Sequence, residues 1–166
     1  MNNDELCLTA SEIRVLVVIV TKMAKHDIER RLAAYGAHIS ELQFGVMRIL
    51  HHRSCTIKEL SGKMLLSPAT LVPVVDALER QELATRGHDP SDRRRTPLTL
   101  TPKGIELVSG LPFMDSNDAL YHSLQQMGNE KSHQLLTLLR ELVSAMLKDE
   151  GRVKAISTDI RSLMNP

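Results

Sequence analysis

The spacing of apolar and polar residues predicts a chain built mainly of helices. Helical periods are expected over residues 9–35, 40–53, 56–65, 67–82, 101–110, 117–127 and 130–148. Between two of these segments, Leu98 and Leu100 alternate with Thr99 and Thr101, which is typical of a strand. Residues 83–88 are the expected partner strand. The two strands predict a β-hairpin.

Side-chain caps mark five of the predicted helix starts. A hydroxyl stands three residues before Glu or Gln, which is the spacing of a capping box, in Thr9-Ala10-Ser11-Glu12, Ser40-Glu41-Leu42-Gln43 and Thr56-Ile57-Lys58-Glu59. Ser67-Pro68 and Thr101-Pro102 each place a cap before a proline at the first helical position, where the missing N–H costs nothing. Three helices, a hairpin and a further helix, in this order, are typical of a winged helix-turn-helix.

The helix at 67–82 has two distinct faces. Leu71, Val74, Val75 and Leu78 fall at core spacing. The opposite face of its N-terminal end is where a recognition helix meets base edges. The residues that this face carries are Ser67, Ala69, Thr70, Val72 and Pro73.

The terminal helices are too apolar to be covered by a winged-helix body of about 60 residues. The N-terminal segment carries Ile13, Leu16, Val17, Val18, Ile19 and Val20, and the C-terminal one carries Leu135, Leu136, Leu138, Leu139, Leu142, Val143, Met146 and Leu147. Each large side chain buried between protomers contributes on the order of 1.5–3 kcal/mol. Pairing with a second copy through a two-fold axis is the simplest way to bury them. An elongated monomer that folds these helices back on itself is the alternative.

The expected fold class is therefore mainly α with a small β-hairpin, an α+β winged helix-turn-helix with long terminal helices for dimerisation. Within one compact domain, we expect residues 1–39 to form an N-terminal dimerisation helix. Residues 40–104 are expected to bind DNA. Residues 105–166 are expected to supply C-terminal helices that complete the dimerisation region, although the sequence assigns no role to 149–166.

Composition fits a soluble protein, with 42% apolar and 25% charged residues. The longest apolar run, Val15 to Val20, is too short to cross a bilayer and does not match a signal peptide, so a cytoplasmic location without membrane contact is expected. Cys7 and Cys55, two thiols outside any paired motif, fit a reducing compartment. The scarcity of aromatic residues disfavours single-stranded nucleic acid as a target.

Charge is uneven although the formal net charge is only +1. Between Ala84 and Lys103, five cations face two anions, which suggests contact with an anionic partner. Three of the cations, Arg93, Arg94 and Arg95, lie beside the predicted hairpin tip, and an arginine in a narrow minor groove gains from its concentrated negative potential. The alternative is an ordinary solvated charge run.

Further candidates are assigned from their positions. Arg86 is a candidate wing contact, and Lys58 and Lys63 are candidate phosphate contacts. Asp89 and Asp92, in the turn Asp89-Pro90-Ser91-Asp92, are assigned a structural role at the wing tip.

Catalytic, cofactor and metal sites are not expected. His51, His52 and Cys55 could suggest a metal, but adjacent helical residues point about 100° apart, and cations near a helix C-terminus are the simpler explanation. Asp76 and Glu79 favour local ion pairs, for instance of Glu79 with Arg80 or Arg86. The sequence shows no nucleophile–base pair, phosphate loop or dinucleotide fingerprint.

Two stretches resemble the MarR family of transcriptional regulators. They are Ser67-Pro68-Ala69-Thr70-Leu71-Val72-Pro73-Val74-Val75-Asp76-Ala77-Leu78-Glu79-Arg80 and the wing signature Asp89-Pro90-Ser91-Asp92-Arg93-Arg94 with Leu98-Thr99-Leu100-Thr101-Pro102-Lys103-Gly104. The resemblance implies a homodimer with two recognition helices in successive major grooves and wings reaching the minor groove. It also implies a repressor-type regulator modulated by a small apolar or aromatic effector, or by an oxidant.

Several residues depart from the commoner family pattern. Commoner members carry Thr and Arg at the positions of Val72 and Pro73, and often a basic residue at the position of Ala77. The side-chain donors that would read bases are therefore missing at these positions. Two alternatives follow: an interaction module without specific DNA readout, and a redox-sensing regulator acting through Cys7. The peroxide-sensing branch of the family shares the proline and uses an N-terminal cysteine, although Cys7 lies well upstream of the expected position.

Overall fold

The computed structural model describes residues 2–88, 95–112 and 114–164. Its elements are, in order, α1 (Asn3–Ala34), α2 (Glu41–His52), α3 (Ile57–Met64), α4 (Pro68–Arg80), β1 (Ala84–Arg86), β2 (Leu98–Leu100), α5 (Pro102–Gly110), α6 (Ala119–Met127), α7 (Asn129–Leu147) and α8 (Glu150–Met164). This order confirms the predicted fold class, a mainly helical winged helix-turn-helix with a small hairpin.

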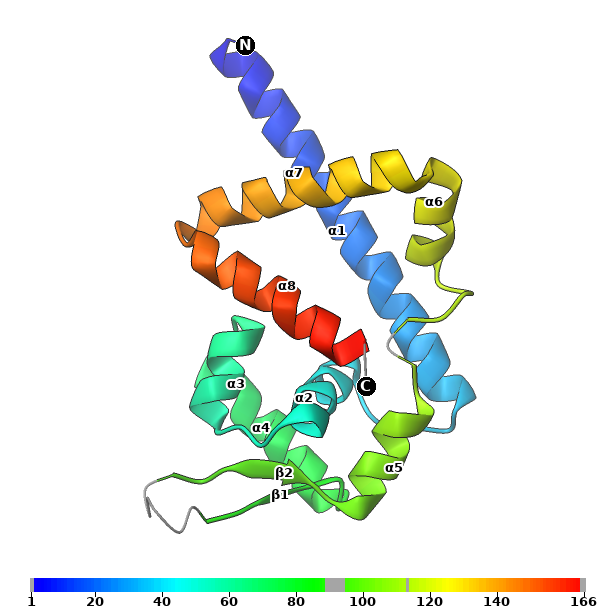
Figure 1. Ribbon diagram of the computed structural model, residues 1–166, viewed down its shortest axis with the longest axis vertical. Helices are drawn as coiled ribbons and strands as arrows, with labels where there is room; N and C mark the ends of the chain where they lie inside the picture. Colours follow the sequence, from blue (N-terminus) through cyan, green and yellow to red (C-terminus); the bar gives the residue numbers. More distant parts are fainter. Residues whose placement is uncertain (1, 89–94, 113, 165–166) are drawn as a thin grey trace.

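The winged-helix body consists of α2, α3, α4, the hairpin and α5, and it holds the core (Figure 1). β1 and β2 pair antiparallel, with Ala84 opposite Leu100. Cys55 forms a β-bridge with the other edge of β2. Its backbone N–H donates to the carbonyl of Leu98 at 3.3 Å, and its carbonyl accepts the N–H of Leu98 at 2.9 Å. The largest fully buried side chains are Met47, Leu60, Leu71, Leu78, Leu98, Val46, Val75, Val108 and Cys55.

Four of the five predicted caps are confirmed, because their chemistry is local. Ser40 and Thr56 form complete capping boxes with Gln43 and Glu59. Ser67 accepts a hydrogen bond from the N–H of Thr70, and Thr101 accepts one from Gly104. Each therefore satisfies a donor that the first helical turn cannot.

The predicted start at Thr9 is wrong. α1 begins seven residues earlier, where the side chain of Asn2 accepts the N–H of Glu5 at 2.8 Å. Thr9 lies inside the helix and donates its hydroxyl to the carbonyl of Glu5 at 2.9 Å. A serine or threonine inside a helix can bond back to the preceding turn, so the capping-box spacing alone does not mark a start.

Polar contacts attach α1 to the segment between α5 and α6. Asp27, only 5% exposed, accepts the N–H of Ala119 at 2.8 Å and is paired with Arg30. Arg31 donates to the carbonyl of Pro112 at 3.0 Å and lies 3.5 Å from Asp118. The turn that leaves the winged-helix body is thus fixed to the end of the first helix.

The long helices form an open frame around the body (Figure 1). The N-terminal end of α1 projects beyond the rest of the chain, and α7 and α8 meet in a sharp turn at Lys148. The sequence did not predict α8. It runs back from that turn and contacts α2.

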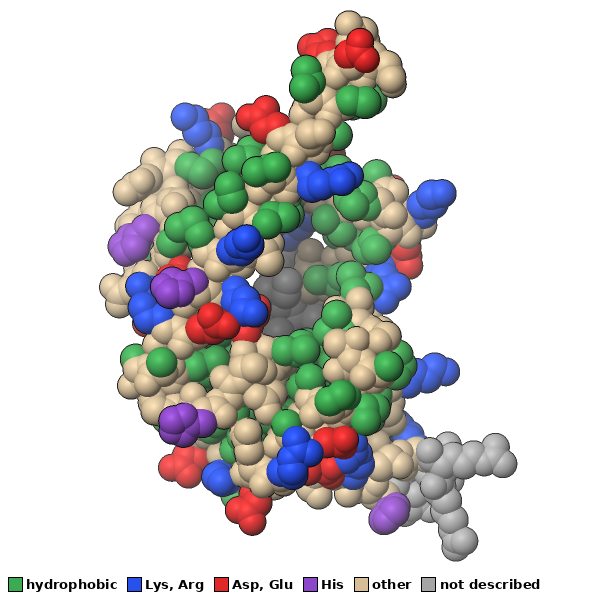
Figure 2. Space-filling model, turned by 180° about the vertical axis from the view of Figure 1, so that it is seen from behind, with side chains coloured by type: hydrophobic (Ala, Val, Ile, Leu, Met, Phe, Trp, Pro, Cys, Tyr) green, Lys and Arg blue, Asp and Glu red, His purple; other side chains and the backbone are tan. Residues whose placement is uncertain are grey.

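Much of the apolar surface of α1 and α7 is exposed, and groups of apolar side chains lie on the upper part of the face seen in Figure 2, with charged and other polar side chains between them. The exposed large apolar residues of α1 are Leu6, Leu8, Ile13, Val15, Leu16, Val17, Val18, Ile19, Val20 and Met23. Those of α7 are Leu135, Leu136, Leu138, Leu139, Leu142, Val143 and Met146. Even so, across the described parts of the chain no helix has an apolar stretch long enough to span a bilayer.

Candidate nucleic-acid interface

The N-terminal end of α4 presents the face that the sequence assigned to base contacts. Leu71, Val75 and Leu78 are fully buried on the other side of the helix, which fixes this face toward solvent. The predicted recognition residues are all exposed, namely Ser67, Ala69, Thr70, Val72 and Pro73. The structure therefore brings all five onto one accessible surface.

Ser67 and Thr70 are the two hydroxyls on this face. Their oxygens lie 2.8 Å apart, and Ser67 Oγ also accepts the N–H of Thr70 at 3.1 Å. α4 continues through Pro73, which has no N–H to donate to the carbonyl of Ala69. The surface thus offers hydroxyls, methyl groups and a carbonyl free of its usual helical donor, the groups that contact adenine, thymine methyls and amino protons.

Arg86 ends β1, opposite Leu98, and is engaged within the protein. Its guanidinium pairs with Asp76 at 2.7 Å and with Glu79, and the backbone N–H of Arg86 donates to Glu79 Oε1 at 3.0 Å. The predicted pair of Glu79 with Arg86 is confirmed. Because two carboxylates of α4 hold this arginine, we expect it to position the wing against the recognition helix, while its contact with DNA remains an untested prediction.

Replacing Arg86 with alanine should loosen the wing rather than remove a base contact. Side-chain exposures of 27–41% in this cluster allow solvent screening, so we expect a loss of about 1 kcal/mol in the free energy of unfolding. Urea denaturation measures it. Arg80→Ala removes an exposed charge from the last turn of the same helix and is the matched control. Equal stability of the two variants would show that the cluster does not hold the wing.

The segment that leads into β2 is held by α3. Arg95 lies 2.9 Å from Glu59, and both side chains are 45% exposed. The backbone N–H of Thr56 keeps the pKa of Glu59 below its usual value, so the carboxylate stays charged opposite Arg95. Lys58, in the first turn of α3, is exposed, and Lys63 is half-buried. The predicted cations Arg93 and Arg94, with Asp89 and Asp92, lie outside the described residues.

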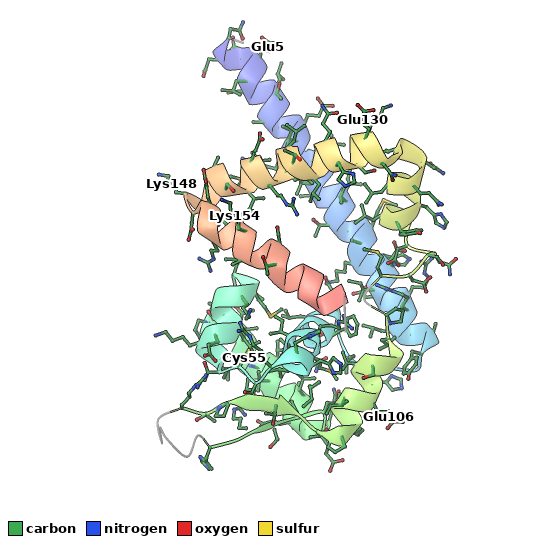
Figure 3. All side chains as sticks on the ribbon, viewed as in Figure 1. Glu5, Cys55, Glu106, Glu130, Lys148 and Lys154 are labelled. Carbon is green, nitrogen blue, oxygen red and sulfur yellow. The ribbon has the colours of Figure 1, made fainter. Side chains whose placement is uncertain are left out.

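The remaining candidates for chemistry lie apart from this face. Cys55 is buried in the body (Figure 3), and burial raises the pKa of its thiol, which disfavours the reactive thiolate. Cys7 is exposed on α1. His51 and His52 contact each other edge to face, and burial is the main cause that lowers the pKa of His52. Among the described residues, no group of three or more His, Cys, Asp or Glu side chains is placed to bind a metal ion.

Comparison with known proteins agrees with this geometry. The MarR family model matches residues 39–96, which include α2, α3, α4 and β1. The transcriptional regulator HosA of Escherichia coli is 32% identical over 109 residues, which cover 64% of this chain and 79% of that protein. The chain belongs to the MarR family.

Two further MarR-type comparisons extend over more of the chain. The regulator MhqR of Bacillus subtilis is 24% identical over 138 residues, 81% of this chain and 93% of MhqR. The crystal structure of an S. aureus MepR–DNA complex has the same fold, with a TM-score of 0.69 and 23% identity, and covers 80% of this chain and 96% of MepR. Both the relatives and the fold are those of transcriptional regulators, not of enzymes, and the protein is a MarR-family regulator.

The sequence predicted Glu79 as a partner of Arg86 but missed two other partners that orient the MarR wing. Asp76 lies 10 positions from its partner Arg86 in the sequence, and Glu59 lies 36 positions from its partner Arg95. No local spacing rule joins such residues. The only available signal was chemical: an acidic residue on the inner side of a recognition helix needs a cation when it is half-buried.

Proposed function

We propose that this MarR-family protein is a homodimeric, sequence-specific repressor that binds duplex DNA. The observation that carries the proposal is the accessible face of α4, with its hydroxyl pair at Ser67 and Thr70, beside a hairpin tied to the same helix by Arg86. A dimer that occupies the duplex excludes other proteins from the same site, so repression is the expected outcome.

The residues take distinct roles in this proposal. The face of α4 reads base edges in the major groove, with the Thr70 hydroxyl as its principal donor and acceptor. The wing arginines Arg93, Arg94 and Arg95 reach the minor groove. Lys58, exposed in the first turn of α3, contacts phosphate and positions the protein without specifying sequence.

Dimerisation is proposed from the exposed apolar faces of α1 and α7. Residues 1–39 and 105–166 form the dimerisation region, and 40–104 form the DNA-binding region. A two-fold axis through the terminal helices presents two recognition helices, so we expect an inverted repeat with half-site centres roughly 34–36 Å apart, one helical turn.

Selection of bound sequences from a random duplex pool tests this function. We expect an inverted repeat, with Thr70→Ala relaxing the preference at one base step by roughly 1–3 kcal/mol while random-DNA affinity is kept. The variant keeps the Ser67 cap, which uses the backbone N–H at position 70. Thr137→Ala, an exposed hydroxyl on the side of α7 that faces the cleft with α8, is the matched control.

Two results would contradict parts of this proposal. Equal loss of cognate and random binding in Thr70→Ala would contradict base reading by Thr70. If no duplex is retained at low salt and the protein instead binds another protein regardless of salt, the chain is an interaction module.

An effector site is proposed in a groove of about 480 Å³ between the end of α1 and the winged-helix body. Its lining includes Tyr35, Ile39, Leu83, Lys103 and Leu107. Apolar walls with a few polar groups suit a small apolar or aromatic ligand, and a pocket of this volume can hold one. Titration with phenols and aromatic carboxylic acids, read by thermal shift and by DNA release, tests this site.

A further inference from the structure

The C-terminal helix α8 is attached to the helix-turn-helix by a specific contact. Asp149 begins α8 by accepting the N–H of Arg152 at 3.0 Å. One turn later, Val153 is only 8% exposed. α8 contacts α2 of the winged-helix body, and it lies between that body and α7 in Figure 1. The chain after α7 thus returns to the DNA-binding region.

Arg152 makes the contact with α3. Its Nη2 donates to the carbonyl of Gly62 at 2.8 Å, and the side chain is half-buried. Gly62 lies in the last turn of α3, where carbonyls have no donor from their own helix. A cation is favoured at this negative end of the helix dipole. Arg152 therefore supplies a C-terminal cap to α3 from 90 residues away in the sequence.

The capped turn leads directly into the recognition helix. Leu65 ends α3 in the left-handed conformation with φ 57°, and its N–H bonds the carbonyl of Ser61. The Ser61 hydroxyl donates to the carbonyl of Leu66 at 2.6 Å, and Ser67 then caps α4. A displacement of the end of α3 would therefore change the angle at which α4 presents Thr70.

On its other side, α8 faces α7 across a cleft. A cleft of about 910 Å³ lies between α7 and α8, lined by residues that include Arg140, Ser144, Lys148, Val153 and Lys154. Figure 3 places Lys148 at the turn and Lys154 on the first half of α8. α8 therefore contacts α7 on one side and the winged-helix body on the other, and the Arg152 hydrogen bond belongs to its contacts with the body.

We propose that Arg152 is a positioning residue, which fastens α8 to the end of α3 and so fixes the recognition helix relative to the dimerisation helices. Through the Arg152 hydrogen bond, α8 then links α7 to the turn between α3 and α4. This inference rests on the proposed function for its effect on DNA, but its structural part can be measured in the free protein.

Amide hydrogen exchange in the full-length free protein is the first test. Arg152→Ala is expected to raise the exchange rates of the backbone amides of residues 65–71 roughly fivefold to tenfold, because it removes a half-buried hydrogen bond from a charged donor. Arg152→Lys keeps the cation and should recover part of the protection. Lys154→Ala, two residues further along α8 and exposed, is the matched control and should leave these amides unchanged.

DNA binding is the second test. For Arg152→Ala, we expect the ratio of cognate to random-duplex affinity to fall roughly fivefold while the salt dependence of binding stays the same. A salt slope lower by about one unit would mean that Arg152 contacts phosphate directly and would overturn the proposal. Exchange identical to that of Lys154→Ala would also overturn it. If the wild-type protein binds no duplex, the proposed function fails, whereas the exchange experiment still decides the role of Arg152.

Discussion

Leu138→Asp is expected to convert the protein into a folded monomer that no longer binds an inverted repeat tightly. Leu138 is 55% exposed in the single chain, so a carboxylate there should cost the protomer little stability. In a dimer the same group would be buried without a partner, a change that costs about 3–5 kcal/mol. The dimer dissociation constant should therefore rise by roughly 100-fold or more.

Sedimentation equilibrium and binding to the selected operator measure the two parts of this result. Thr137→Asp is the matched control, because Thr137 lines the cleft between α7 and α8, on the polar side of α7. It adds the same charge one residue away and should leave dimerisation intact. A wild-type protein that is already monomeric, or a Leu138→Asp variant that still dimerises with wild-type affinity, would remove the support for the terminal helices as the interface.

The division of α7 into two sides explains why these neighbouring residues should behave differently. Leu135, Leu138, Leu142 and Met146 recur at helical spacing and are exposed. The side toward α8 carries polar residues such as Arg140. A second copy would cover the apolar side, whereas the polar cleft can stay hydrated.

Sequence patterns predicted those features of the fold that depend on residues close together in the chain. The caps at Ser40, Thr56, Ser67 and Thr101 are examples, since each uses an N–H three residues ahead. The same rule failed at Thr9, because a cap at Asn2 had already begun the helix and a hydroxyl can equally bond backwards.

Features that depend on distant residues were not predictable in this way. Among the described side chains of α8 only Val153 is buried, and the Arg152 cap on Gly62 joins residues 90 positions apart. The recognition face could be assigned because the buried positions Leu71, Val75 and Leu78 leave only one side of α4 free. The ion pairs of Arg86 with Asp76 and of Arg95 with Glu59 could not, since they join α4 and α3 to the hairpin across the folded body.

Gly104→Ala is expected to destabilise the protein severely, because this glycine lies directly against another backbone segment. A Cβ at position 104 would lie 2.0 Å from the carbonyl oxygen of Leu83, which already accepts the N–H of Thr101 at 3.1 Å. Backbone atoms cannot yield as a flexible side chain can. α5 would have to move away from the start of β1, at a cost of about 3 kcal/mol or more.

The matched control is Gly62→Ala, because a Cβ there meets nothing within 4 Å. Gly62 is helical, so alanine should stabilise the protein by roughly 0.5–1 kcal/mol. Thermal and urea unfolding should therefore shift in opposite directions for the two variants, and equal shifts would contradict the close approach at Gly104.

Since α5 leads from the hairpin toward the C-terminal helices, any Gly104→Ala protein that still folds should also lose operator affinity by at least roughly tenfold, about 1.4 kcal/mol. The glycine in the wing signature thus has a packing reason: it lets the helix that leaves the wing lie against the strand that enters it.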